Sequence, residues 1–118
     1  MGPVELLRWQ WAGYPRYHRS RANLLLHLVV VPVFLAGNVG LLAALSVRSP
    51  GLAIASLAAI LASVALQGRG HRLEEIPPEP FTSVANAISR LLLEQWITFP
   101  RYVLTGGWAE ALRRARAG

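Results

Sequence analysis

Apolar residues are concentrated in two runs in the first two thirds of the chain. The first run covers residues 24–47. It is interrupted only by His27, Pro32, Asn38 and Ser46. A helix needs about 20 predominantly apolar residues to cross the hydrocarbon layer of a bilayer, so this run is long enough to span it. Ser20 is a suitable N-cap for a helix that starts near Arg21. The pattern predicts a long apolar helix with polar residues gathered at its beginning.

A second apolar run covers residues 52–66 and follows the sequence Arg-Ser-Pro-Gly at residues 48–51, which predicts a tight turn. The run is short for a full span. Its alanines and serines nevertheless favour the close helix–helix packing on which association in lipid depends. The two runs together predict an antiparallel helical hairpin that crosses a membrane. A hairpin buried in a soluble protein remains open as the alternative, because the second run is short.

The pattern changes from continuously apolar to amphipathic after the hairpin. Residues 76–80 contain three prolines and predict an extended segment, and Ser83 or Thr82 can cap the helix that follows. Apolar side chains then recur at helical spacing over residues 84–104, with an interruption at Pro100. This segment is predicted to be an amphipathic or partly embedded helix rather than a third span.

Both ends of the chain have the composition of segments at a membrane surface, and for residues 3–17 a plain amphipathic core helix remains open as the alternative. Residues 3–17 combine tryptophans and tyrosines with arginines, a mixture typical of the bilayer interface. A short helix there should end at Gly13 and Pro15. Near the other end, residues 108–117 carry three arginines and predict a basic helix that lies on the membrane surface.

Composition supports a membrane protein of one domain, residues 1–118. Hydrophobic residues make up 53% of the chain and charged residues only 15%, whereas a soluble domain carries about a quarter charged residues. The fold class that these observations predict is an all-α integral membrane protein. The oligomeric state is left open.

The net charge of +6 does not point to nucleic acid, because the arginines flank the apolar runs and do not gather on one polar face. Attraction to anionic lipid headgroups explains the same charge. Arginines precede the first run and follow the second, and only Arg48 lies in the turn between them. The positive-inside rule therefore predicts that both chain ends face the cytoplasm.

The three histidines are the candidate chemistry. His18 and His27 lie at the beginning of the first run, and His71 follows the end of the second, so an antiparallel hairpin brings them to one end. Asn23 is four residues before His27 and shares its helical face. His18 is nine residues before His27, which is half a turn out of register on one helix. The chain must therefore break between His18 and His27 for His18 to join the site.

The second half of this site is predicted at residues 67–75. Two glycines, Gly68 and Gly70, should let the chain leave the second helix sharply. If a new helical turn begins there, His71 and Glu75 share a face, with Glu74 to one side. The chain has no cysteine, so a metal would be held by histidine, carboxylate or backbone oxygen, a set that suits Fe(II), Mn(II) or Zn(II). The alternative is that the histidines are structural and only hydrogen-bonded.

A family resemblance is carried by two motifs. They are His18-x4-Asn23-x3-His27-x4-Pro32 and Gln67-x2-Gly70-His71-x3-Glu75. This pattern resembles the small membrane proteins typified by the fungal 2-hydroxy fatty acid dioxygenase. Residues 78–82 and 94–101 resemble the short bacterial branch of the same family. The resemblance covers roughly residues 14–108 and implies location in a bacterial inner membrane.

The resemblance implies an Fe(II)-dependent dioxygenase that shortens a 2-hydroxy fatty acid by one carbon, using dioxygen and no 2-oxoglutarate. His18, His27 and His71 would be the iron ligands. Glu75 would be a further ligand or a base, and Asn23 would orient a ligand or the substrate. Two other functions remain open. One is a non-catalytic membrane protein that organises lipid or a partner, and the other is a zinc-dependent lipid hydrolase.

Overall fold

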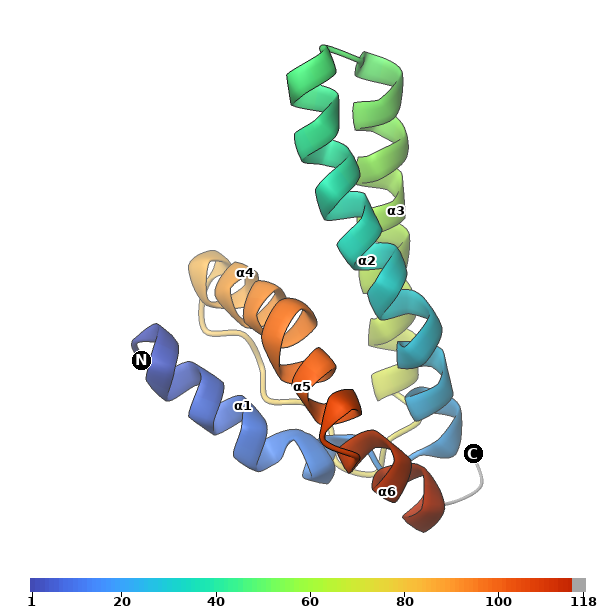
Figure 1. Cartoon of the computed structure of the whole chain (residues 1–118). Helices are drawn as coiled ribbons and strands as arrows, with labels where there is room; N and C mark the ends of the chain where they lie inside the picture. The colour runs from blue at the N-terminus through green and yellow to red at the C-terminus, as the bar shows by residue number, and fades with distance from the viewer. Residues whose placement is uncertain (116–118) are drawn as a thin grey trace.

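A computed structural model of the chain describes residues 1–115, and the part that it describes consists of helices and their connections (Figure 1). The α-helices in chain order are α1 (Pro3–Tyr17), α2 (Arg21–Val47), α3 (Pro50–His71), α4 (Val84–Leu93), α5 (Phe99–Leu104) and α6 (Gly107–Arg114). A π-helical turn, η1 (Glu94–Thr98), joins α4 to α5 without a break. The prediction of an all-α fold is confirmed.

Helices α2 and α3 form the predicted antiparallel hairpin, which rises beyond the other helices (Figure 1). Ser20 caps α2 as predicted, since its side chain accepts a hydrogen bond from the Asn23 backbone N–H. The helices approach closely where small residues face each other. A Cβ atom at Gly37 would lie 3.0 Å from the Ser56 backbone oxygen. These contacts fix the relative position of the two helix ends that carry His27 and His71.

Helix α3 is longer than the apolar run predicts. It continues through Gly68 and Gly70 and ends at His71, so the expected sharp exit at the glycines is wrong. An interior glycine costs a helix only about 1 kcal/mol relative to alanine. Packing of Gln67 and Gly70 against neighbouring elements, where both are buried, outweighs that cost. The added residues make α3, like α2, long and apolar enough to cross a membrane by length and composition.

Helix α1 also extends beyond its predicted end, through Gly13 and Pro15 to Tyr17. The prediction that these two residues terminate the helix is wrong because tertiary packing holds its last turns. Tyr14 is buried in a small core with Val31, Phe99 and Tyr102. This core joins α1 to the hairpin and to α5.

The predicted helix over residues 84–104 is one continuous helical segment made of α4, η1 and α5. Pro100 lies in the first turn of α5, directly after the π-helical turn. In that turn the Phe99 backbone N–H donates to the Glu94 backbone oxygen five residues earlier, so the widened turn absorbs the interruption. Ser83 caps α4 as predicted.

Helix α1 packs against α4 and η1, so the three form a second layer beside the base of the hairpin (Figure 1). The Gln10 side chain links them: its Nε2 donates to the Arg90 backbone oxygen at 2.8 Å, and its Oε1 accepts from Thr98 Oγ1 at 2.9 Å. Helix α6 lies against α2, where Trp108 Nε1 donates to the Leu24 backbone oxygen. The basic helix predicted over residues 108–117 is observed as far as Arg114, and residues 116–118 lie outside the described part.

Candidate metal centre

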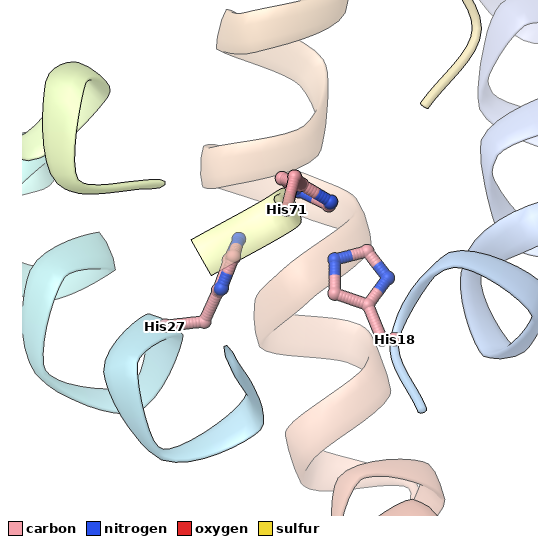
Figure 2. Close-up of side chains that lie close together, drawn as sticks. All are labelled: His18, His27 and His71. Atoms are coloured by element: carbon pink, nitrogen blue, oxygen red, sulfur yellow. The ribbon is translucent and has the colours of Figure 1, made fainter. Parts of the chain in front are cut away.

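The three histidines meet at the base of the hairpin (Figure 2). His18 comes from the connection between α1 and α2, His27 from α2 and His71 from the last residue of α3. Their ring centroids are 4.9 to 5.1 Å apart in all three pairs. One nitrogen from each ring lies within 4.8 Å of the corresponding nitrogens of the others. The predicted meeting of the histidines is confirmed, and so is the break in the chain that it required.

Two of the rings are held by backbone oxygens, which determines where their protons lie. His18 Nδ1 is 2.8 Å from the Tyr14 oxygen, and His27 Nδ1 is 2.9 Å from the Asn23 oxygen. A carbonyl oxygen can only accept, so in each ring Nδ1 carries the hydrogen and Nε2 is left with its lone pair. The Tyr14 ring adds a second restraint by stacking on His18, with centroids 3.8 Å apart.

Three of the remaining ring nitrogens are buried and have no hydrogen-bond partner within the described residues. They are His18 Nε2, His27 Nε2 and His71 Nδ1. A buried polar atom without a partner is costly and rare in folded proteins. Here three such atoms belong to the same cluster, and two of the rings donate their other N–H to protein carbonyls, as metal-bound histidines do. The residues therefore fit a metal ion.

Electrostatics also favour a metal over a proton at His18. Burial, followed by the neighbouring His27 and His71 rings, lowers the pKa of His18 well below its usual range. The ring is therefore neutral at physiological pH. A neutral imidazole is the form that binds a metal.

Glu74 ties the elements of the site together. Its buried carboxylate accepts from the Arg19 backbone N–H at 2.8 Å, from the Ser20 backbone N–H at 3.0 and 3.1 Å, and from Asn23 Nδ2 at 2.7 Å. These donors lie at the start of α2, where an anion is also favoured by the helix dipole. Glu74 thus joins the chain just after His71 to the chain just after His18.

Asn23 is fully buried beside His27. Its backbone oxygen holds His27 and its amide nitrogen donates to Glu74. Its Oδ1 atom is buried without a hydrogen-bond partner in the described part of the chain. Asn23 therefore contacts both His27 and Glu74.

Glu75, the glutamate singled out by the sequence, lies in a different environment from Glu74. The helical turn expected to place it on one face with His71 does not form, because α3 ends at His71. Glu75 is exposed and lies in the wall of a cavity that also contains His18 and His71. Spacing from His71 could not separate two adjacent glutamates, and only the fold shows which of them is turned toward Asn23.

This cavity has a volume of about 700 Å³ and extends from His18 and His71 between α1, α3 and α4. Such a volume is typical of small-molecule sites. Its apolar walls include Trp9, Tyr17, Val64, Pro77, Phe81 and Leu91. Its polar groups besides the histidines include Gln67, Arg72 and Glu94. The cavity therefore has the mixed lining of a site for a ligand with an apolar body and a small polar end.

Two residues that were not predicted as site residues lie in or next to this cavity. Gln95, which is fully buried, exchanges two hydrogen bonds with Gln67, of 2.9 and 2.8 Å, and so ties η1 to α3. Glu94 lines the cavity, and although part of its side chain reaches the surface, burial raises the pKa of its carboxyl to about 7 against the opposing effect of Arg90. The carboxyl can therefore hold or release a proton near neutral pH.

Comparison with known proteins adds no relative: no protein-family model, no curated protein and no solved structure matches this chain.

Proposed function

We propose that the protein is a membrane-embedded Fe(II)-dependent dioxygenase that shortens 2-hydroxy fatty acids by one carbon. The main support for a metal site is that His18, His27 and His71 each have a buried ring nitrogen without a hydrogen-bond partner in the described part of the chain. The substrate class rests on the resemblance of the histidine motifs to those of the fungal dioxygenase. A cavity with apolar walls beside the histidines supports the same class.

The donor set is compatible with iron. Three imidazoles without sulfur suit Fe(II), Mn(II) or Zn(II) and leave coordination positions open. Bound Fe(II) would supply the redox chemistry with dioxygen. His18, His27 and His71 would hold it, with Glu74 and two backbone carbonyls keeping the rings in place.

The other groups of the cavity have roles that follow from their chemistry. Arg72 can pair with the substrate carboxylate, and Glu94 can hold or release a proton at the polar end. The apolar walls formed by Val64, Leu91 and the aromatic residues accommodate the acyl chain and exclude water.

The reaction is balanced without a further reductant. The bond between C1 and C2 of the 2-hydroxy acid breaks, C2 becomes the carboxyl carbon of the shortened acid, and C1 leaves as carbon dioxide. Dioxygen takes up the four electrons that C1 and C2 lose. One shortened acid, one carbon dioxide and one water together contain all the atoms of the 2-hydroxy acid and dioxygen. The chain therefore needs only the 2-hydroxy acid and dioxygen besides its metal.

Membrane placement is supported by the hairpin. Helices α2 and α3 are each long and apolar enough to span. The outer half of the hairpin exposes large apolar side chains, among them Val39, Leu42, Leu45 and Ile54 at 56 to 71%. An exposed apolar surface of this extent marks contact with a membrane or a protein. With both chain ends in the cytoplasm, the histidines lie at the cytoplasmic end of the hairpin.

The test combines metal content with turnover. Protein purified anaerobically is offered Fe(II), and bound metal is measured by elemental analysis for the wild type, His27→Ala and His71→Ala. We expect near-stoichiometric iron in the wild type and loss of iron in both variants while the helical content is retained. The iron-loaded wild type should consume dioxygen with 2-hydroxypalmitate and release the acid shorter by one carbon, but not with palmitate.

Other outcomes would contradict the proposal in distinguishable ways. Metal content that is negligible in the wild type and unchanged in the variants would favour a non-catalytic membrane protein. Bound zinc with turnover of a lipid ester in the absence of dioxygen would favour a hydrolase.

A further inference from the structure

Helix α4 and turn η1 carry an exposed apolar stripe, which we define as Val84, Ile88, Leu92 and Trp96. Their exposed fractions are 78, 53, 39 and 44%. Residues four apart lie on one side of a helix, so the four side chains form one continuous strip. Each is large and apolar, and none belongs to the core around Tyr14. Contact with another apolar phase would remove the strip from water.

The opposite side of the same helix faces the protein. Arg90, Leu91 and Glu94 line the cavity beside the histidines. The backbone oxygen of Arg90 accepts from Gln10 of α1, and Thr98 donates to the same side chain. The stripe is therefore turned away from α1 and from the cavity.

The direction of the stripe relative to the hairpin follows from the arrangement of the helices. Figure 1 shows α1 on one side of α4, while α2 and α3 rise past α4 toward the other side. Because the stripe points away from α1, it faces the side into which the hairpin projects. The hairpin, whose exposed apolar residues include Val39 and Ile54, projects to that side (Figure 1).

The charged side chains of this helical segment also lie on the side that faces the protein. The charged residues between 84 and 104 are Arg90, Glu94 and Arg101. The first two line the cavity, and the guanidinium of Arg101 lies over the Trp11 ring of α1 at 3.9 Å. The stripe therefore carries no charge. The outer side of α1, in contrast, exposes Arg8 and Arg16.

We propose that this stripe is immersed in the bilayer leaflet that surrounds the base of the hairpin, so that α4 and η1 lie in the plane of the membrane. Lipid acyl chains contact the stripe, and α1 faces the aqueous side. The proposal rests on the membrane placement of the hairpin given above and not on the metal chemistry. It makes α4 and η1 the wall between the leaflet and the cavity.

The depth of the metal site agrees with this placement. Helix α2 has 27 residues and is about 40 Å long, so His27 lies about 30 Å from the turn at the far end of the hairpin. The hydrocarbon layer is also about 30 Å thick. When the hairpin spans it, the histidines lie at headgroup level, where an acyl substrate in the leaflet has its carboxylate.

The experiment uses the absence of cysteine in the natural chain. Single-cysteine variants of the full-length protein carry a nitroxide spin label at Ile88→Cys in the stripe, at Val39→Cys in the hairpin, and at Arg8→Cys on α1. The labelled proteins are placed in vesicles of phosphatidylcholine and phosphatidylglycerol. Collision of each label with dioxygen, which concentrates in lipid, is compared with collision with a water-soluble nickel chelate. Iron content is measured on the same samples.

We expect the labels at positions 88 and 39 to collide several-fold more with dioxygen than with the nickel chelate, and the label at position 8 to show the reverse. If the label at 88 resembles that at 8 while the label at 39 stays in lipid, the stripe is in water and the proposal is overturned. Shielding of position 88 from both reagents means that a second copy or another protein covers it, which also overturns the proposal. If position 39 is in water, the membrane placement fails, whereas the metal site is judged separately by the iron content.

Discussion

The carboxylate of Glu74 bonds two backbone N–H groups and one side-chain amide, all within the first residues after His18 or the first turn of α2. None of these donors is a candidate metal ligand. In the proposed metal centre Glu74 therefore acts through position, because its hydrogen bonds join the chain after His18 to the chain just after His71 at the end of α3. Partners of this kind orient metal ligands and tune their affinity.

At this scale we predict that Glu74→Gln weakens metal binding and Glu75→Gln does not. The amide that replaces Glu74 presents an NH₂ group toward N–H donors, so at least one contact is lost. We expect the affinity for Fe(II) to fall about tenfold to hundredfold in Glu74→Gln and to change little in Glu75→Gln. Competition with a coloured iron chelator under anaerobic conditions measures both. A loss confined to Glu75→Gln would make Glu75 the ligand and would refute the positioning role of Glu74.

At the scale of elements, the site depends on how closely α3 approaches α2 at Gly70. A Cβ atom at Gly70 would collide with Asn23 Oδ1 and would lie 2.9 Å from Leu26 Cδ2. Gly68, two residues earlier on the same helix, has nothing within 4 Å of such an atom. The two glycines therefore differ in packing, although both lie near the end of the same helix.

We expect Gly70→Ala to lower the free energy of unfolding by about 1 to 3 kcal/mol, as overpacking does, and to weaken metal binding by displacing His71. Gly68→Ala should raise the free energy of unfolding by up to about 1 kcal/mol, because alanine is the better helix former. Denaturant unfolding in detergent micelles compares the two variants with the wild type. Stabilisation by both substitutions would show that α2 and α3 do not approach as closely as described.

At the scale of the whole molecule, the hairpin divides the protein into an apolar part and a polar base. Within the described residues, the far half of α2 and α3 stands clear of the other helices, while α1, α4 and α6 lie toward the end that holds the histidines (Figure 1). Such a shape suits a protein whose site lies at the membrane surface and whose hairpin anchors it there.

For the whole molecule we predict that Val39→Arg impairs membrane insertion and Ser46→Arg does not. Val39 is exposed near the middle of the hairpin, and a charged residue at the centre of a span costs about 2.5 to 3.5 kcal/mol on insertion. Ser46 is exposed beside Arg48 at the turn, where an arginine can reach headgroups. The fraction of each variant that resists alkaline extraction from membranes measures the effect. Equal retention of both would indicate that the hairpin does not lie in lipid.

Local signals were sufficient for the parts of this protein that depend on neighbouring residues. The apolar run over residues 24–47 predicts α2, Ser20 predicts where it begins, and the turn at 48–51 makes the hairpin antiparallel. A hairpin then brings His27 and His71 to one end, and the break before Ser20 frees His18 to join them. These inferences hold because each requires only helical periodicity, a cap and a short turn.

Contacts between residues far apart in the sequence were decided only by the tertiary structure. The choice of Glu74 over Glu75 as the partner of Asn23, the pairing of Gln67 with Gln95 and the extension of α1 past Pro15 all depend on packing between elements. Spacing from His71 does not separate two adjacent glutamates. A helix-breaking glycine or proline costs only about 1 to 3 kcal/mol, which burial and hydrogen bonding across elements can outweigh. By itself the sequence determined the hairpin and the three histidines at its base, and the packing around that base decided which groups hold them.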